Sequence, residues 1–238
     1  MKLQGKTALI TGGSKGIGRA IAESMLSAGM NVGITGRSMT SLNSVVDELK
    51  SKYGDKVLAF EADVRDYTAQ QNAVSNLTSK FGSLDVVIAN AGVGHFAPID
   101  EMSHDQWNDI IDINLTGVFN TVKASVESIK NSEGYIITIA SLAGTNFFAQ
   151  GSAYNASKFG LVGFTQAVML DLRKYGVKVS TIMPGSVSTY FNDHTPSEAD
   201  AWKIQPEDIA ELTMDILKMN PRTLPSKIEV RPSRPDKK

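Results

Sequence analysis

Short apolar runs alternate along this chain with longer stretches whose apolar residues recur at helical spacing. The runs are Thr7–Thr11, Asn31–Thr35, Lys56–Glu61, Leu84–Ala89, Tyr135–Ala140, Val177–Met183 and Lys227–Val230. Several are apolar at nearly every position, which is typical of strands that are covered on both faces. Strands that alternate with helices pair in parallel through right-handed crossovers. The pattern therefore predicts an α/β fold with a parallel sheet and helices on both of its faces.

Composition narrows the class of protein further. The 238 residues are 42% hydrophobic and 21% charged, so the chain can bury a core of domain size. A formal net charge of -1 gives no indication of a nucleic acid or membrane partner. The absence of cysteine excludes disulfides and thiolate chemistry, and it fits a reducing compartment. No apolar stretch has the length of a signal-peptide core or a membrane span, so we expect a cytoplasmic protein.

A glycine-rich loop follows the first predicted strand and directly precedes a helical pattern. Glycines at this place allow a tight turn, close approach of a diphosphate to the backbone, and close packing of helix on strand. The amides at the helix N-terminus can then bind the diphosphate. A plain tight turn would contain similar glycines, but the position between strand and helix favours a dinucleotide site. The residues that we expect to bind the cofactor here are Gly12, Ser14, Lys15, Gly16, Ile17 and Gly18.

The end of the second predicted strand indicates which nicotinamide cofactor is bound. NAD-binding folds carry an acidic residue there for the ribose 2′-hydroxyl, whereas this chain reads Gly36-Arg37-Ser38. The guanidinium of Arg37 suits a 2′-phosphate, and Lys15 could reach the same group. Both could also be ordinary solvated cations, as most surface lysines and arginines are. The missing carboxylate together with two well-placed bases favours NADP(H).

The ordered motifs of the chain resemble those of the classical short-chain dehydrogenases/reductases, from about residue 5 to residue 230. Thr11–Gly18 resembles the family's cofactor motif, and Asn90-Ala91-Gly92 resembles its sheet-stabilising motif. Pro184–Thr189 resembles the motif that meets the nicotinamide carboxamide. The residues with the order and approximate spacing of the catalytic tetrad are Asn114, Ser141, Tyr154 and Lys158. Among subtypes, the pattern is similar to the 3-oxoacyl-acyl-carrier-protein reductase group.

This resemblance implies a single-domain Rossmann-type fold, a doubly wound, seven-stranded, mainly parallel sheet. It implies that Asp63 and Val64 flank the adenine. It further implies two sets of contacts, one on the ribose side of the cofactor (Asn90, Ala91, Gly92) and one at the nicotinamide end (Pro184, Gly185, Val187, Thr189). Tyr154 and Lys158 are also expected to touch the cofactor. The three histidines have no metal-ligand spacing, so no metal site is expected.

The predicted helix Ser152–Tyr175 contains the residue expected to transfer a proton to the substrate, Tyr154, and the lysine expected to tune it, Lys158. A phenol with a pKa of about 10 is protonated at neutral pH and can donate a proton to a carbonyl oxygen. Tyr154 and Lys158 are four residues apart and share a helix face, so the ammonium should lower the pKa of the phenol. Ser141 would hold the carbonyl oxygen, and by resemblance Asn114 would position a water linked to Lys158. Taken singly, each could be an ordinary surface, cap or helix-interior residue.

The remaining expectations concern the substrate and the partners. Aromatic residues that follow strand ends or motifs should form an apolar pocket, although packing in the core or at an interface is equally consistent with them. They are Phe96, Phe147, Phe148, Tyr190 and Phe191. The irregular segment 186–205 should form a lid on the single domain 1–238, which ends in a polar tail, 231–238. The predicted helix Ser152–Tyr175 has apolar residues on nearly all sides, so a second subunit should cover part of it. In the family that the chain resembles, this helix and the one near Ile111–Ile129 form the dimer contact. We therefore expect a homodimer, which could extend to a homotetramer.

The expected function is NADPH-dependent reduction of a carbonyl, in a small ketone or a carrier-bound 3-oxoacyl thioester. Two alternatives stay open at this point. One is an alcohol or sugar dehydrogenase that runs oxidatively, because the motifs serve both directions. The other is a sensor that binds NADP(H) without catalysis.

Overall fold

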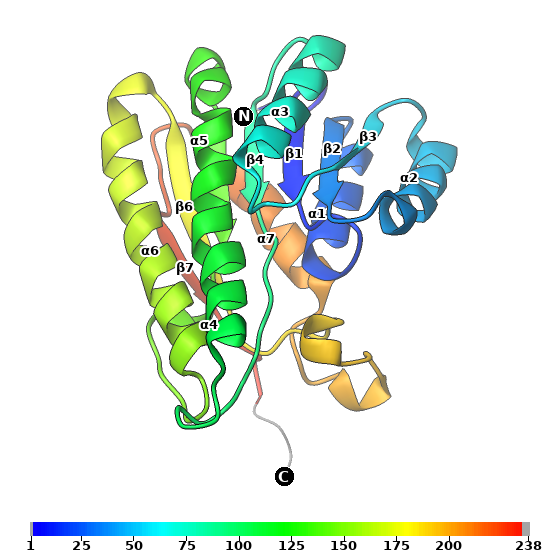
Figure 1. Cartoon of the computed structure of the whole chain (residues 1–238). Coiled ribbons are helices and arrows are strands. Elements are labelled where there is room, and N and C mark those ends of the chain that lie inside the picture. Colours follow the sequence, from blue (N-terminus) through cyan, green and yellow to red (C-terminus); the bar gives the residue numbers. More distant parts are fainter. Residues whose placement is uncertain (1, 235–238) are drawn as a thin grey trace.

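The seven strands in the described part of the chain form one parallel sheet. The computed structural model describes residues 2–234, and the strand order is β3-β2-β1-β4-β5-β6-β7 (Figure 1). The strands are β1 Thr7–Thr11, β2 Asn31–Gly36, β3 Val57–Glu61, β4 Val86–Ala89, β5 Tyr135–Ile139, β6 Lys178–Pro184 and β7 Lys227–Val230. Every pairing is parallel, with Ile10 of β1 opposite Ile34 of β2 and Ile88 of β4. The prediction of a doubly wound, seven-stranded Rossmann-type sheet is confirmed.

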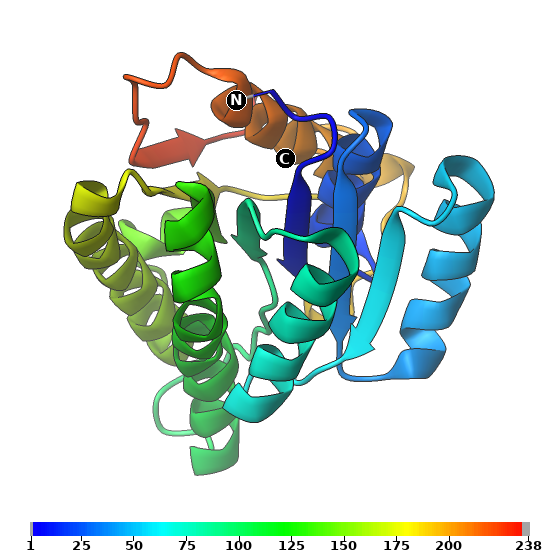
Figure 2. The ribbon, with the colours of Figure 1, turned by 90° about the horizontal axis from the view of Figure 1, so that it is seen from above.

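The helices cover both faces of the sheet (Figure 2). One buried cluster joins the sheet to α1 Gly16–Ser27, α2 Met39–Tyr53 and α7 Pro206–Lys218. The other joins it to α3 Tyr67–Phe81, α5 Gly117–Ser132 and α6 Ser152–Leu172. The short helix α4 His104–Ile111 lies beside α6 at the lower edge in Figure 1. No helix within residues 2–234 is long and apolar enough to cross a membrane.

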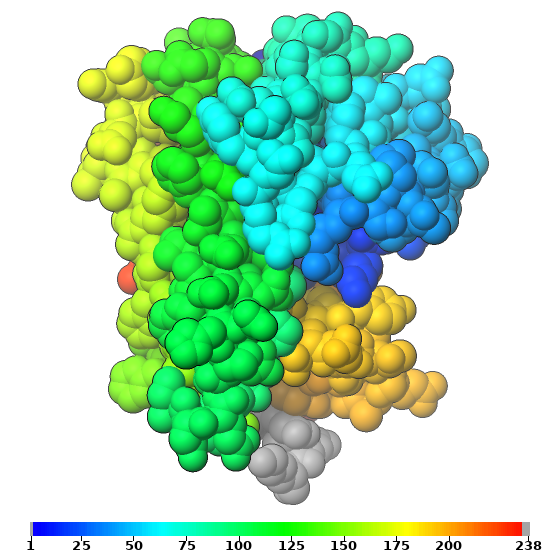
Figure 3. Space-filling view, viewed as in Figure 1, coloured from blue at the N-terminus to red at the C-terminus, as the bar shows by residue number. Residues whose placement is uncertain are grey.

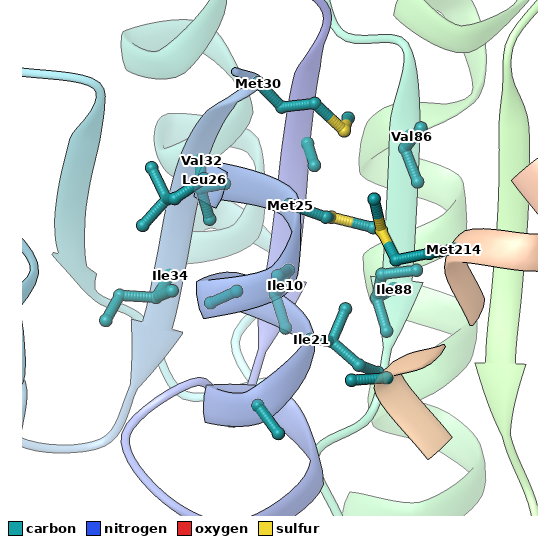
Figure 4. Packing of buried hydrophobic residues seen from close by; sticks show 14 of the residues in the cluster. Ile10, Ile21, Met25, Leu26, Met30, Val32, Ile34, Val86, Ile88 and Met214 are labelled. Carbon is teal, nitrogen blue, oxygen red and sulfur yellow. The ribbon is translucent and has the colours of Figure 1, made fainter. Parts of the chain in front are cut away.

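The first of these clusters fixes α1 against the sheet and α7. Ile21 and Met25 of α1 are fully buried and face Ile10 and Ile88, with Met214 of α7 packed on the same group (Figure 4). Burial of side chains of this size stabilises the fold by about 1.5–3 kcal/mol each. The packing therefore holds the N-terminus of α1 at a fixed place beyond the end of β1.

Two predicted helices differ from the observed ones in their bounds. The predicted helix Ser152–Tyr175 ends as an α-helix at Leu172 and continues as one 3₁₀ turn, Arg173–Tyr175, because Gly176 adopts a left-handed conformation (φ 73°). The predicted helix near Ile111–Ile129 is divided into α4, a wider π turn at Asp112–Thr116, and α5. The amide of Gly117 bonds to the carbonyl of Asp112, five residues back, which inserts the extra residue.

A crevice is expected where neighbouring strands feed crossovers to opposite faces, and here that place lies between β1 and β4. The carboxyl ends of all strands meet at this edge, close to the segment 186–205 (Figure 1). That segment is tied at its base by pairing of Val187 with Ile204, and the amide of Ser188 donates to the Ile204 carbonyl at 2.9 Å. It contains two 3₁₀ turns, Phe191–Asp193 and Glu198–Asp200. The predicted tail is described as far as Arg234, and its residues 235–238 lie outside the described part of the chain.

Candidate active site

The glycine loop after β1 forms a tight turn that leads directly into helix α1, as the sequence predicts. Gly12 and Gly16 are left-handed, with φ of 68° and 56°. The amides of Gly12 and Gly13 donate to the carbonyl of Thr35 at 3.0 and 3.2 Å, which ties the loop to β2. Helix α1 then begins with no acidic residue in its first turn and no side chain capping its N-terminus. The amides at its start are thus available to an anion.

Asn90 fastens this loop to the end of β4. Its Nδ2 donates to the carbonyls of Thr11 and Gly12 at 3.0 and 3.2 Å. The hydroxyl of Thr11 in turn accepts from the amides of Asn90 and Ala91, both at 3.1 Å. The sequence placed Thr11 in a motif but did not predict these hydrogen bonds, because they depend on β4 lying beside β1.

Gly18 is the point where the loop tolerates least change. A Cβ on Gly18 would lie 2.6 Å from Asn90 Nδ2 and closer still to the Gly12 carbonyl. Gly18→Ala should therefore force the backbone to move and lower the free energy of unfolding by about 1–3 kcal/mol, as overpacking does. Urea denaturation measures the change. Gly163→Ala is the matched control, because it is also a helical glycine but its Cβ would meet nothing within 4 Å. Equal stabilities of the two variants would contradict the close packing at Gly18.

Two cations near the glycine loop, Lys15 and Arg37, are both exposed. Neither forms an ion pair with any residue in the range 2–234, although the charge of Arg37 contributes to the lowered pKa of Asp63. The Nζ of Lys15 lies 5.7 Å from the ring centroid of Tyr190, across the crevice. Both cations are thus available for an anion such as a phosphate.

Asp63 and Val64 follow β3 at the same edge. The carboxylate of Asp63 is held by Arg65, with Nη2 to Oδ2 at 2.6 Å, and this hydrogen bond is the main cause that lowers the pKa of Asp63. Val64 is buried against Gly117, where a Cβ would lie 2.5 Å from Val64 Cγ2. The carbonyl of Val64 accepts from Asn120 Nδ2 at 2.9 Å. Arg65 was missed in the sequence, because nothing in its spacing shows that it folds back on Asp63.

Asn114 lies in the π turn and is fully buried. Its Oδ1 accepts from the Val93 amide at 2.8 Å, and its Nδ2 donates to the Val93 carbonyl at 2.9 Å and to Ser157 Oγ at 3.2 Å. The side chain therefore clamps the loop that follows Asn90. The predicted role in positioning a water stays a prediction, and the side-chain amide already has these three protein partners.

Ser141, Tyr154 and Lys158 meet beyond the end of β5. The Ser141 hydroxyl accepts from the Ala143 amide at 3.1 Å and is hydrogen-bonded to the Tyr154 hydroxyl. Lys158 is 5% exposed, and its Nζ donates to the Ile139 carbonyl at 3.2 Å and lies 5.6 Å from the Tyr154 ring centroid. A Cβ on Gly92 would lie 3.2 Å from Asn114 Oδ1 and 3.8 Å from Lys158 Nζ. The four residues of the predicted tetrad are thus gathered around one place.

Burial shifts both titratable groups of this cluster towards their neutral forms. It raises the pKa of Tyr154 to about 12, against the smaller opposing effect of the hydrogen bond from Ser141. It lowers the pKa of Lys158 to about 8. The sequence-based expectation was a lower phenol pKa, induced by the ammonium. Desolvation of the phenol is the larger effect, so the phenol stays protonated at neutral pH.

The end of β6 supplies the opposite wall of the crevice. A Cβ on Gly16 would lie 3.3 Å from Thr189 Cγ2, so the glycine loop and the segment after Pro184 approach each other closely. The amide of Gly185 donates to the Val230 carbonyl at 2.8 Å, and Val187 pairs with Ile204. A cavity of about 260 Å³ touches both Gly16 and Thr189. In Figure 3 the surface is hollowed between the gold segment 186–205 and the blue N-terminal part of the chain.

Two of the five predicted pocket aromatics contact Tyr154, and a third joins them through Phe96. The ring centroids of Phe96 and Phe191 lie 5.4 and 5.7 Å from that of Tyr154, and Phe148 lies 5.8 Å from Phe96. Tyr190 turns the other way, towards Lys15. Phe147 is 86% exposed and lies outside this ring cluster.

Comparison with known proteins gives consistent matches over most of the chain. The short chain dehydrogenase family model matches residues 6–200. A 3-oxoacyl-[acyl-carrier-protein] reductase of Salmonella typhimurium is 35% identical over 190 residues, 79% of this chain and 76% of that protein. The solved alcohol dehydrogenase of Thermococcus sibiricus, complexed with 5-hydroxy-NADP, has a TM-score of 0.91 at 29% identity and covers 97% of this chain and 98% of its own. The solved 3-ketoacyl-(acyl-carrier-protein) reductase of Brucella melitensis, complexed with NADH, has a TM-score of 0.88 at 25% identity and covers 98% and 99%.

Proposed function

The chain belongs to the short-chain dehydrogenase family, and on that premise we propose that this oxidoreductase uses NADPH to reduce a carbonyl group to an alcohol. The observation that carries the proposal is the phenol of Tyr154, protonated and hydrogen-bonded to Ser141 beside the buried Lys158. The substrate class that we propose is a small ketone or a 3-oxoacyl thioester. The likeness to the two acyl-carrier-protein reductases supports the second of these.

The described residues fit a dinucleotide with a 2′-phosphate. Gly12, Gly16 and Gly18 place no side chain of their own in the loop, and the amides at the start of α1 are uncapped. Arg37 and Lys15 would hold the 2′-phosphate, and the segment from Pro184 to Thr189 would hold the nicotinamide end. Lys158 has one protein acceptor for a buried ammonium, which leaves donors for the nicotinamide ribose. The alcohol dehydrogenase of Thermococcus sibiricus, which was solved with an NADP derivative, supports this assignment.

The bound cofactor supplies hydride to the carbonyl carbon, and the residues of the chain manage the oxygen. Ser141 donates a hydrogen bond to the carbonyl oxygen and stabilises the charge that develops there. Tyr154 transfers its proton to the same oxygen. A phenol held protonated by burial keeps this proton available across the neutral pH range. Lys158, beside the ring, stabilises the phenolate that is left behind.

This state of Tyr154 favours reduction over the oxidative alternative. An alcohol dehydrogenase needs a base, and a phenol whose pKa lies at about 12 is a poor base near neutrality. The direct test is consumption of NADPH with a panel of ketones that includes acetoacetyl thioesters, beside reduction of NADP⁺ with the corresponding alcohols and with sugars. Turnover of at least one ketone is expected. Turnover of alcohols or sugars alone would favour the oxidative enzyme, and tight NADPH binding with no turnover would favour a sensor.

Removal of Arg37 tests the choice of cofactor. A charge-assisted bidentate contact is worth about 1.5–3 kcal/mol, so Arg37→Ala should raise the KM for NADPH about 10- to 100-fold. The KM for NADH should stay unchanged, because NADH lacks the phosphate. Arg222→Ala, which removes another exposed arginine between α7 and β7, is the control. An unchanged NADPH preference in Arg37→Ala would show that this residue does not bind the phosphate.

The proposal extends to the organisation and the assembly of the protein. The whole chain would act as one dinucleotide-binding and catalytic domain, with 186–205 as its lid. The surface of α5 and α6 carries exposed Phe119, Phe159 and Leu170, with Phe119 packed edge-on against Phe164 at 6.3 Å. A two-fold pairing of these helices would cover this apolar surface in a homodimer.

A further inference from the structure

Phe191 is the one lid residue whose ring contacts Tyr154 within the described part of the chain. The two ring centroids are 5.7 Å apart with the planes tilted by 58°. The hydroxyl of Tyr154 must meet the substrate carbonyl in the proposed reaction, so an apolar group attached to that carbonyl has to come close to this ring. The side chain of Phe191 lies at this place.

The place that Phe191 fills exists because residue 94 is a glycine. A Cβ on Gly94 would lie 2.6 Å from Phe191 Cζ, which is too close for any real Cβ, and 3.1 Å from Phe96 Cζ, which is a tight contact. Gly94 is buried and has no unusual φ, so its backbone does not require a glycine. What the missing side chain provides is room for an aromatic ring beside Phe96 and Tyr154.

The backbone directly after Phe191 is strained. Asn192 and Asp193 are both left-handed, with φ of 55° and 58°, and neither is a glycine. A left-handed conformation costs a non-glycine residue free energy, less for Asn and Asp than for other residues, and the contacts of Phe191 with the rings offset this cost. The part of the lid that follows these two residues is held independently, because buried Asp200 bonds to His194 at 2.6 Å and to Lys203 at 2.5 Å. Asn192 and Asp193 therefore lie between the Phe191 ring and a fixed part of the lid. A change of backbone conformation at these two residues would move the Phe191 ring away from Tyr154 and leave the rest of the lid in place.

We propose that Phe191 occupies the apolar subsite of the substrate, and that a ketone reaches Tyr154 when its own flat apolar group replaces the Phe191 ring over Gly94. The ligand class is then a carbonyl compound with a benzyl-sized apolar group next to the carbonyl carbon. Smaller substituents gain too little contact to replace the ring. This inference rests on the proposed carbonyl reduction and adds the residue pair that selects its substrate.

Two ketones test the subsite directly, with NADPH as the reductant. Benzyl methyl ketone carries the same benzyl group as phenylalanine, and butan-2-one carries an ethyl group in its place. Burial of the larger apolar group should give benzyl methyl ketone a KM about tenfold lower or more. In Phe191→Ala no ring has to be replaced, so the KM for benzyl methyl ketone should fall by a further factor of about three to ten, with little change in kcat. Gly94→Val should close the subsite and remove the advantage of the benzyl group.

Controls keep these outcomes separable. Tyr175→Ala truncates another half-exposed aromatic, whose ring contacts are with Lys130 and Lys174, and should leave both KM values unchanged. NADPH binding, followed by its fluorescence, verifies that each variant is folded. An unchanged KM for benzyl methyl ketone in folded Phe191→Ala, or a benzyl advantage that survives in Gly94→Val, would overturn the inference.

A second readout does not depend on turnover. Tetranitromethane nitrates exposed phenolates, and mass spectrometry of the peptide that contains Tyr154 gives the rate at this residue. Withdrawal of the covering ring should hydrate the phenol, so Phe191→Ala should be nitrated at Tyr154 several-fold faster than the wild type. If no ketone reacts, the proposed function fails while nitration still decides whether Phe191 covers Tyr154. Equal nitration rates would contradict the covering.

Discussion

Tyr154→Phe should lose nearly all ketone reduction while it binds NADPH as tightly as the wild type. The substitution removes only the hydroxyl, and the ring keeps its contacts with Phe96 and Phe191. A positioned general acid contributes about 10²- to 10⁴-fold to a rate, so kcat should fall by at least about a hundredfold. The rate of NADPH consumption measures the loss, and fluorescence titration measures the binding.

Tyr53→Phe provides the matched control for this variant. Its hydroxyl is also hydrogen-bonded, to Ser27 at 2.9 Å, but it lies on α2 and far along the chain from the cluster at α6. The control should keep the wild-type kcat. Turnover that survives in Tyr154→Phe would show that another group donates the proton.

Lys158→Met should gain stability and lose activity. The ammonium is buried and its pKa is lowered to about 8 from 10.5, so the fold bears the cost of an incompletely solvated charge at neutral pH. Methionine has a similar length and no charge. We expect the free energy of unfolding at pH 7 to rise by about 1–2 kcal/mol, after the loss of one hydrogen bond to Ile139. The value of kcat/KM should fall by at least about a hundredfold, because the phenolate and the ribose lose their cation.

The pH dependence of stability separates this effect from a general change in packing. Between pH 8 and pH 10.5 the unfolded chain keeps the Lys158 proton that the fold gives up, so wild-type stability should rise with pH. The contribution amounts to about 2 kcal/mol between pH 8 and pH 10. Above pH 10 the raised pKa of Tyr154 acts in the opposite direction, because the fold then keeps a proton that the unfolded chain loses.

Urea denaturation at pH 8 and pH 10 therefore distinguishes the two chains. The Lys158→Met variant should lack the wild-type rise, whereas Lys80→Met, on the exposed end of α3, should retain it. A variant that is less stable than the wild type at pH 7 would contradict the cost assigned to the buried ammonium.

The sheet and the glycine loop could be predicted because local patterns determine them. Runs of consecutive apolar residues mark strands covered on both faces, and the bounds of Thr7–Thr11 and Lys227–Val230 agree with the observed strands. Gly12, Gly16 and Gly18 follow the first strand directly, and the predicted reasons for glycine there agree with their φ values and close approaches. The order of strand, glycines and helix along the chain is enough to predict the turn, whereas the contact of Gly18 with Asn90 depends on β4 lying beside β1.

The contacts that depend on distant residues could not be predicted in this way. The clamp of Asn114 on Val93 exists because the π turn brings the amide to a loop 21 residues earlier in the chain. Burial raises the pKa of Tyr154, and the spacing of Tyr154 and Lys158 along the helix does not show how deeply the phenol is buried. Phe191 was predicted as one of several pocket aromatics, and its particular place requires both Gly94 and the left-handed Asn192 and Asp193.

Transfer of deuterium from NADPH that carries deuterium at both positions of the nicotinamide C4 tests the central claim most directly, because the result does not depend on which of the two is transferred. The product alcohol from a ketone substrate should carry one deuterium on its carbinol carbon in the wild type, and Tyr154→Phe should form almost none of it. Mass spectrometry of the alcohol gives the answer without reference to any rate. An absence of labelled alcohol from every ketone tested, despite bound NADPH, would contradict carbonyl reduction as the function of this chain.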